Sequence, residues 1–155
     1  MLNSRTPRIE YALRIIAIRE NRSIPFDDLI AFSRDAIARN NGILFIEGVG
    51  GIMVPLDGQR TVLDWMAELD IPLLLVVGGY LGTISHTLTA LDVLRQRKLR
   101  LAAIVVSESE RNPVELDDTV ASIARFSEGV DVIGLPRLPA GITQHPAFAR
   151  IAAHL

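Results

Sequence analysis

Apolar positions along the chain switch between helical spacing and short continuous runs. In the segment 26–39 the apolar side chains recur every three to four residues, and Asp27 and Asp28 occupy the first turn, where carboxylates are favourable. The same spacing predicts helices over 9–18, 26–39, 61–69, 83–96, 113–125 and 146–154. The segment 51–60 has neither pattern and is expected to be a loop that carries a site.

The continuous apolar runs predict strands over 43–46, 72–77, 101–106 and 130–134. The run 72–77 is unbroken by polar residues, which is typical of a strand covered on both faces in the middle of a parallel sheet. Because strands and helices alternate, we predict an α/β fold with a parallel sheet and helices on both faces. With 155 residues and no linker, the range 1–155 is expected to form a single domain.

Composition and charge narrow the classes of protein. The chain is 49% hydrophobic, which argues against disorder, and its 16 Lys+Arg against 18 Asp+Glu give no electrostatic footprint for nucleic acid. The absence of cysteine excludes thiolate chemistry and is compatible with a reducing compartment. The apolar run 71–82 is shorter than the roughly 20 residues that span a bilayer. We therefore expect a cytoplasmic protein with no nucleic-acid or membrane partner.

Glu47 is the most informative polar residue, because it directly follows the predicted strand 43–46. A carboxylate there is costly unless it is paired or bound to a cation, and glycines such as Gly50 let backbone N–H groups approach an anion. This arrangement suits a magnesium-bound phosphate. A glutamate that accepts backbone hydrogen bonds in a tight turn has the same local pattern, so both interpretations stay open.

A second candidate site lies at Gly82, Thr83, Ile84 and Ser85, where the predicted helix 83–96 begins. The N–H groups and the positive dipole end of a helix start attract a carboxylate or phosphate, while ordinary capping by Thr83 or Ser85 is the alternative. No G-x-x-x-x-G-K-S/T or G-x-G-x-x-G motif is present, and Lys98 is the only lysine. We therefore expect no useful ATP turnover from this chain by itself.

The run 45–56, with sequence FIEGVGGIMVPL, resembles the signature of the dethiobiotin synthetase family. The resemblance continues through 64–65, 72–77, 81–90, 101–106 and 134–138, and the chain looks like the carboxyl-terminal two-thirds of such an enzyme. It implies a P-loop NTPase-like α/β fold without its amino-terminal strand and P-loop, and a homodimer that contacts through the helix 83–96. The implied reaction forms the ureido ring of dethiobiotin from 7,8-diaminononanoate, CO2 and ATP with Mg2+.

The resemblance also assigns roles to residues of this chain. Glu47 would bind Mg2+, and the backbone of Gly50 would contact the carbamate or phosphate. The helix start 82–85 would hold the carboxylate tail of the substrate. The adenine pocket would be lined by Ser107, Pro136, Arg137 and Leu138.

Three departures from the family pattern affect these expectations. The Walker-type loop with its Lys and Thr is missing, and Ser107 and Ser85 stand where the family usually has Asn. The chain is therefore expected to need a P-loop half for turnover. A non-catalytic interaction module or decayed fragment of the same fold is the alternative. A third alternative is a related amidoligase or partitioning-ATPase-like domain. The presence of both sequence motifs, 54–56 and 81–86, argues against it.

Overall fold

The computed structural model describes residues 25–48 and 50–155, and the chain divides into two compact units, Met1–Asp70 and Ile71–Leu155. The helix predicted over 9–18 lies outside the described residues. The single domain expected over 1–155 stays a prediction, and each unit is described by itself. No helix in the described residues combines the length and hydropathy that a membrane crossing requires.

The described part of the first unit contains α2 (Phe26–Arg39) and α3 (Val62–Leu69). The bounds of α2 confirm the prediction, with acidic residues in its first turn and a basic residue in its last. The helix α3 starts with a reciprocal capping box between Thr61 and Asp64. Asp64 is half-buried, and its carboxylate caps its own helix by accepting a 2.8 Å hydrogen bond from Thr61 N.

Apolar side chains pack α2 and α3 together with the loop that precedes α3. The buried members of this cluster are Phe26, Ile30, Leu56 and Val62. Trp65 packs against them, and its indole N–H donates a 3.1 Å hydrogen bond to Ser33 Oγ. The polar end of the indole is therefore satisfied while its ring adds apolar contact.

The loop 51–60 is irregular as expected, and its turn is organised by Asp57. The backbone N–H groups of Gln59 and Arg60 donate to Asp57 Oδ1 at 2.8 and 2.7 Å. These bonds hold the pKa of the Asp57 carboxyl below its ordinary value. The Arg60 guanidinium lies 4.2 Å from the centre of the Phe26 ring, which connects the loop to α2.

The strand predicted over 43–46 is wrong. Ile43, Leu44 and Phe45 are 65%, 41% and 63% exposed, and the segment has no regular structure. A buried strand must pair its backbone N–H and C=O groups with a neighbour, and none of the described strands pairs with this segment. Apolar composition alone therefore gave the wrong secondary structure here.

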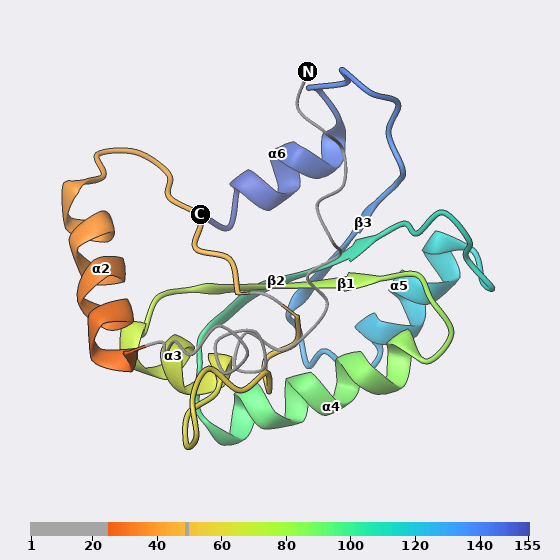
Figure 1. The fold of residues 1–155 in the computed structure, drawn as a ribbon. Coiled ribbons are helices and arrows are strands. Elements are labelled where there is room, and N and C mark those ends of the chain that lie inside the picture. The colour runs from red at the N-terminus through yellow and green to blue at the C-terminus, as the bar shows by residue number, and fades with distance from the viewer. Residues whose placement is uncertain (1–24, 49) are drawn as a thin grey trace, which may run out of the picture. The chain divides into compact units, whose positions relative to one another are not determined.

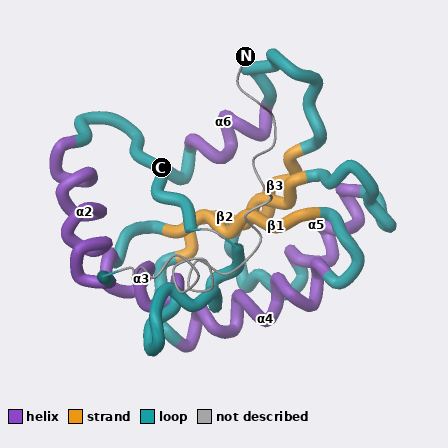
Figure 2. Tube along the Cα trace, in the orientation of Figure 1, coloured by secondary structure: helices purple, strands orange, loops and turns teal. Residues whose placement is uncertain are grey.

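The second unit is a parallel α/β sheet. Its elements, in chain order, are β1 (Leu73–Gly78), α4 (Thr83–Gln96), β2 (Leu101–Ser107), α5 (Leu116–Ala124), β3 (Asp131–Leu135) and α6 (Pro146–Ala152). The strand order is β1-β2-β3 with both pairs parallel (Figure 2), which confirms the predicted fold class. Among the described strands β2 is central, so the central position expected for 72–77 is not met.

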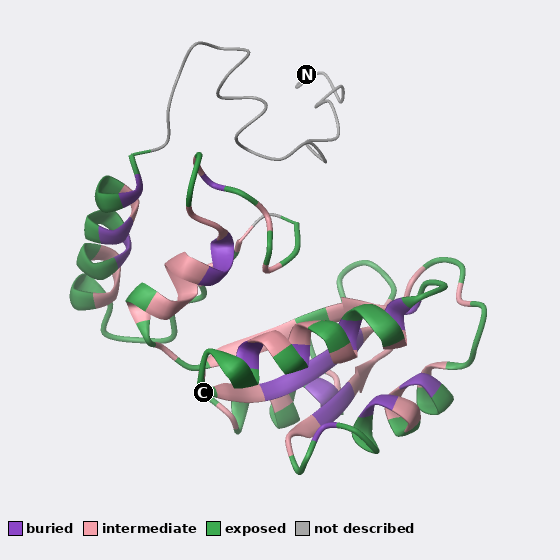
Figure 3. Cartoon of the chain, turned by 90° about the horizontal axis from the view of Figure 1, so that it is seen from below, coloured by how far each residue is buried: buried purple, intermediate pink, exposed green. Residues whose placement is uncertain are grey.

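Helices cover both faces of this sheet (Figure 1), with α4 and α5 on one side and α6 on the other. On β2, Ile104 and Val106 join the core under α4 and α5, while Ala103 joins a smaller cluster with Ala147 of α6. This alternation follows from the two-residue period of a strand. Figure 3 shows the buried residues concentrated on β2 and on the sheet-facing sides of the helices.

Candidate functional site

Three strand ends meet in one row across the sheet. Gly78 of β1 pairs with Ser107 of β2, and Ser107 pairs with Leu135 of β3. Because the strands are parallel, the segments that follow them leave from the same edge, where ligands gather in open α/β sheets. This edge therefore gathers the segments that follow the three strands, which begin at Gly79, Glu108 and Pro136.

The start of α4 is built from its backbone. Gly82 is the N-cap residue with φ of 94°, a conformation that favours glycine. The hydroxyl of Thr83 is buried and donates to the Gly78 carbonyl oxygen at 2.5 Å, while Ser85 is exposed. No side-chain hydrogen bond caps the helix, so capping by Thr83 or Ser85 is wrong. The backbone N–H of Thr83 donates to the Tyr80 carbonyl oxygen at 3.1 Å, so part of this first turn is satisfied from within the chain.

Two side chains beside this helix start form a hydrogen bond. Tyr80 Oη lies 3.0 Å from His86 Nδ1, which links the loop after β1 to the first turn of α4. Ile84 packs on the core, whereas Leu81 is 87% exposed. The exposed leucine next to a polar helix start is a feature that a contact surface would explain.

A hydrogen-bonded chain of residues connects the segments after all three strands. Gly79 N donates to Ser109 Oγ at 2.9 Å, and Ser109 N donates to Asn112 Oδ1 at 3.0 Å. Asn112 Nδ2 donates to Glu108 Oε1 at 3.3 Å, and Arg137 N donates to Glu108 Oε2 at 2.7 Å. The sequence alone did not reveal these partners, because Gly79 and Ser109 lie 30 residues apart and Glu108 and Arg137 lie 29 residues apart.

The residues expected to bind the adenine base follow the central strand β2 and the outer strand β3. Ser107 is the last residue of β2 and is half-buried, as are Pro136 and Leu138, while Arg137 is exposed. The backbone N–H of Arg137 is engaged by Glu108. One hydroxyl and the apolar surfaces of Pro136 and Leu138 are suited to a flat heterocycle with a polar edge.

Glu47 and Gly50 belong to the first unit. Glu47 is exposed in an irregular segment. Gly50 has φ of 82°, and a Cβ there would lie 2.7 Å from Val54 Cγ2, so this turn requires glycine. A Cβ on Gly48 would lie 2.8 Å from Val62 Cγ1. Among the described residues, no three His, Asp or Glu side chains gather closely enough to hold a metal by themselves.

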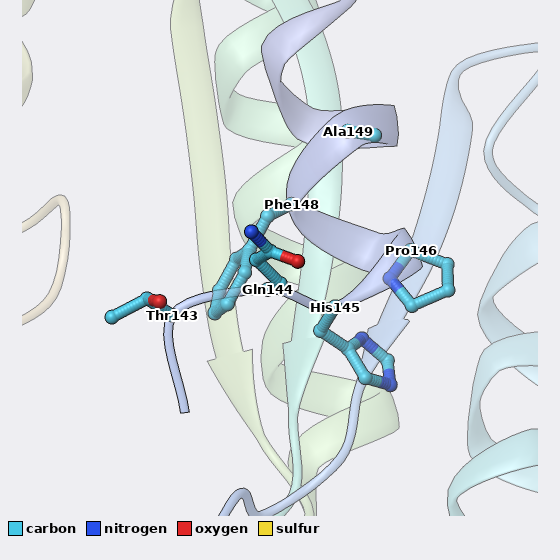
Figure 4. A pocket seen from close by; sticks show the side chains of 6 residues that line it. All are labelled: Thr143, Gln144, His145, Pro146, Phe148 and Ala149. Atoms are coloured by element: carbon cyan, nitrogen blue, oxygen red, sulfur yellow. The ribbon is translucent and has the colours of Figure 1, made fainter. Parts of the chain in front are cut away.

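An open hollow lies beside the first turn of α6 (Figure 4). It is lined by Thr143, Gln144, His145, Pro146, Phe148 and Ala149. His145 Nδ1 accepts a 3.2 Å hydrogen bond from Ala147 N, so this ring caps the helix. None of the residues that the sequence analysis assigned to a site lines this hollow.

The fold and the strand-end edge define the class of protein. The family described as "AAA domain" matches residues 8–143, and the chain belongs to this family, which has a P-loop NTPase-like α/β fold.

The most informative relatives are named dethiobiotin synthetases. The chain is 51% identical over 109 residues to the "ATP-dependent dethiobiotin synthetase BioD" of Acidiphilium cryptum (strain JF-5), covering 70% of this chain and 49% of the relative. It is 44% identical over 137 residues to the protein of the same name from Caulobacter vibrioides (strain NA1000 / CB15N), covering 88% and 62%. The resemblance found in the sequence is confirmed, and the chain spans between 49% and 62% of these relatives.

Proposed function

We propose that this chain is the nucleotide-base, magnesium and substrate-tail portion of an ATP-dependent dethiobiotin synthetase. The reaction is the ligase step of biotin biosynthesis that closes the ureido ring from 7,8-diaminononanoate and CO2. The row Gly78, Ser107 and Leu135 is the observation that carries this proposal, because it gathers three candidate ligand segments on one edge. Sequence identity of 44–51% over the aligned residues to proteins of that name supports it.

The adenine of ATP is expected between Ser107 and the turn Pro136, Arg137 and Leu138. These residues fit a base, since the half-buried Ser107 at the end of β2 pairs with Leu135, which directly precedes the segment with the half-buried Pro136 and Leu138. ATP supplies the phosphoryl group that activates the substrate carbamate. Ser107 and the segment 136–138 bind and orient the base.

The carboxylate tail of diaminononanoate is expected at Gly82, Thr83, Ile84 and Ser85. The absence of a side-chain cap on α4 supports this assignment, because the helix start can then satisfy an external carboxylate. Thr83 contributes by fixing the loop, since its hydroxyl is held by the Gly78 carbonyl oxygen. Ser85 is exposed and can donate directly to the tail.

Mg2+ is expected at Glu47. The ion commonly takes one or two protein carboxylates and completes its shell with water and substrate phosphate oxygens, so a single exposed carboxylate fits this donor set. Bound Mg2+ neutralises phosphate charge. Glu47 supplies an anchoring oxygen, and the backbone of Gly50, free of a Cβ, can approach an anion closely.

A cytoplasmic homodimer that contacts through the helix 83–96 completes the proposal. The exposed positions of α4 include Ser85, His86, Thr89 and Asp92, which are polar, whereas Leu81 just before the helix is apolar and 87% exposed. A contact centred on Leu81 and continued by polar side chains matches the usual anatomy of an interface.

Turnover requires a phosphate cradle, and the 155 residues contain no Walker-type motif to form one. The decisive experiment mixes the chain with a separately produced amino-terminal segment that carries a Walker-type loop and measures dethiobiotin by mass spectrometry. ATP-dependent product formation only in the mixture is expected. No product from a folded, associated mixture would contradict the proposed reaction.

A non-catalytic interaction module is the second candidate, and one observation favours it. Ile43, Leu44 and Phe45 are exposed without forming a strand, and Val76 of β1 is 63% exposed. Exposed apolar segments are typical of partner surfaces. Binding of a protein partner with no response to nucleotide or diaminononanoate would support this candidate over the synthetase.

A further inference from the structure

Glu108 joins the end of β2 to the end of β3 by two different groups. Its backbone N–H extends the sheet ladder and donates to the Leu135 carbonyl oxygen at 2.9 Å. Its side chain reaches the segment just after β3, where Oε2 accepts a 2.7 Å hydrogen bond from Arg137 N. The first residues after β3 are therefore held beside Ser107.

We propose that Glu108 is the positioning residue of the nucleotide-base pocket, an inference that rests on the proposed function. Both carboxylate oxygens accept donors from the protein, one from Arg137 N and the other from Asn112 Nδ2. Glu108 therefore acts through the turn that it holds and does not read the base itself. The ligand class is an adenine nucleotide bound by Ser107, Pro136 and Leu138.

The physical advantage is pre-organisation. Residues 136–139 have no regular secondary structure, so ordering them during binding would cost conformational entropy. A charge-assisted hydrogen bond is about twice as strong as a neutral one, and the half-buried position of Glu108 limits screening by water. The turn is then already placed when the base arrives.

Asn112 sets the orientation of this carboxylate. Because Asn112 Oδ1 accepts from Ser109 N, its amide nitrogen must face Glu108 Oε1. Gly79 packs against the same amide, and a Cβ there would overlap Asn112 Oδ1 and lie 2.9 Å from Asn112 Cγ. Asn112, which packs against Gly79 after β1, therefore orients Glu108. Glu108 in turn holds the segment after β3 through Arg137 N.

Exchanging the carboxylate and the amide between positions 108 and 112 reverses this donor and acceptor pattern without changing the net charge. Glu108→Gln brings an amide group opposite the Asn112 amide while one oxygen serves Arg137, so two donors face each other. Adding Asn112→Asp restores complementarity, since the introduced carboxylate can accept from both Ser109 N and the new glutamine. The exposed neighbour Glu110→Gln is the matched control, because it removes the same charge two residues away.

The test is amide hydrogen exchange and chemical-shift titration of the full chain by NMR, with adenosine 5′-monophosphate as the probe. In Glu108→Gln we expect the Arg137 amide to exchange about tenfold faster and the affinity for the nucleotide to fall roughly three- to tenfold. The double variant should return both values to within about twofold of the parent chain, and Glu110→Gln should change neither.

Two results would overturn the inference: an Arg137 amide that exchanges equally in Glu108→Gln, or a double variant that behaves no better than the single one. A variant that fails to fold is recognised by its spectrum, and the double variant then provides the comparison with the parent chain. If nucleotide causes no chemical-shift change at Ser107 or 136–138 of the parent chain, these residues do not bind the base. The proposed function at this site and the base-positioning role of Glu108 are then both contradicted. The exchange data then decide separately whether Glu108 orders the turn.

Discussion

Arg150 donates a 2.6 Å hydrogen bond to Asp131 Oδ1, which ties α6 to the first residue of β3. His154 Nε2 lies 3.1 Å from the other carboxylate oxygen, so one oxygen is engaged from α6 and the other from the turn that follows it. Asp131 stands at the amino end of β3, opposite the strand-end edge that holds the candidate site. The cluster therefore stabilises the unit without entering the site.

Replacing Asp131 with Asn should lower stability in a pH-dependent way. The His154 hydrogen bond, followed by the charge and hydrogen bond of Arg150, holds the pKa of Asp131 below its ordinary value of 3.8, although burial acts in the opposite direction. Because the folded-state pKa is the lower one, the carboxylate stabilises the fold above about pH 4, and this contribution is lost as the pH falls through the folded-state pKa.

The measurement is urea unfolding of the parent chain and Asp131→Asn at pH 7 and pH 2.5. The carboxylate is 35% exposed and partly screened, so we expect a loss of about 0.5–1 kcal/mol at pH 7 and a smaller loss at pH 2.5. The exposed Glu110→Gln serves as the control for removal of a charge. An equal loss at both pH values would contradict this assignment.

Gly79→Ala should disturb the junction between β1 and the 108–112 loop. The new Cβ would overlap Asn112 Oδ1 and lie 2.9 Å from Asn112 Cγ, so the amide must move and its bonds to Ser109 and Glu108 weaken. We expect a loss of about 1–3 kcal/mol in the free energy of unfolding, measured by urea denaturation. Gly58→Ala, where nothing lies within 4 Å, should change it by less than about 0.5 kcal/mol.

Asn112→Ala tests whether the clash is the cause. In the Gly79→Ala background it removes the colliding amide, so the double variant should lose less stability than the sum of the two single losses. Additive losses would show that the alanine at position 79 acts through another contact.

Glu47→Gln should slow dethiobiotin formation in the mixture with a P-loop segment. Loss of the anionic oxygen weakens the expected hold on Mg2+, and we predict a rate at least about tenfold lower with an unchanged circular dichroism spectrum. Glu68→Gln, an exposed carboxylate of the same unit, is the control. An unchanged rate for Glu47→Gln at ample Mg2+ would rule out the metal role.

Leu81→Glu should weaken self-association. The side chain is 87% exposed, so the fold is expected to remain intact while a charge enters the proposed contact beside α4. Sedimentation velocity should show a dimer for the parent chain and at least a tenfold weaker one for the variant. A parent chain that stays monomeric at high concentration, or a variant that dimerises equally well, would contradict the proposed dimer.

Local signals in the sequence predicted the helices well because each signal lies inside the element. The bounds of α2 and α4 agree with the prediction, since helical spacing and end residues mark both. The α5 helix begins at Leu116 and not at 113, because Glu115 is extended and serves as the N-cap. The segment 43–46 failed since strand formation depends on a neighbour that composition does not specify.

The candidate site was predictable only as a set of segments. Parallel topology places the residues after each strand on one edge, so Ser107 and 136–138 could be expected to lie close together. The bond between Glu108 and Arg137 joins residues 29 apart and has no local signal. The polar run after β2 was the available indication that such partners exist.

The most direct test of the account is calorimetric titration of the purified chain, of known mass in solution, with Mg·ATP and with 7,8-diaminononanoate. We predict saturable binding of diaminononanoate by a dimer, weakened by the substitution Ser85→Ala, with nucleotide binding but no ATP hydrolysis. A folded chain that binds neither ligand would contradict the assignment of its strand-end edge to a dethiobiotin synthetase and would favour an interaction module.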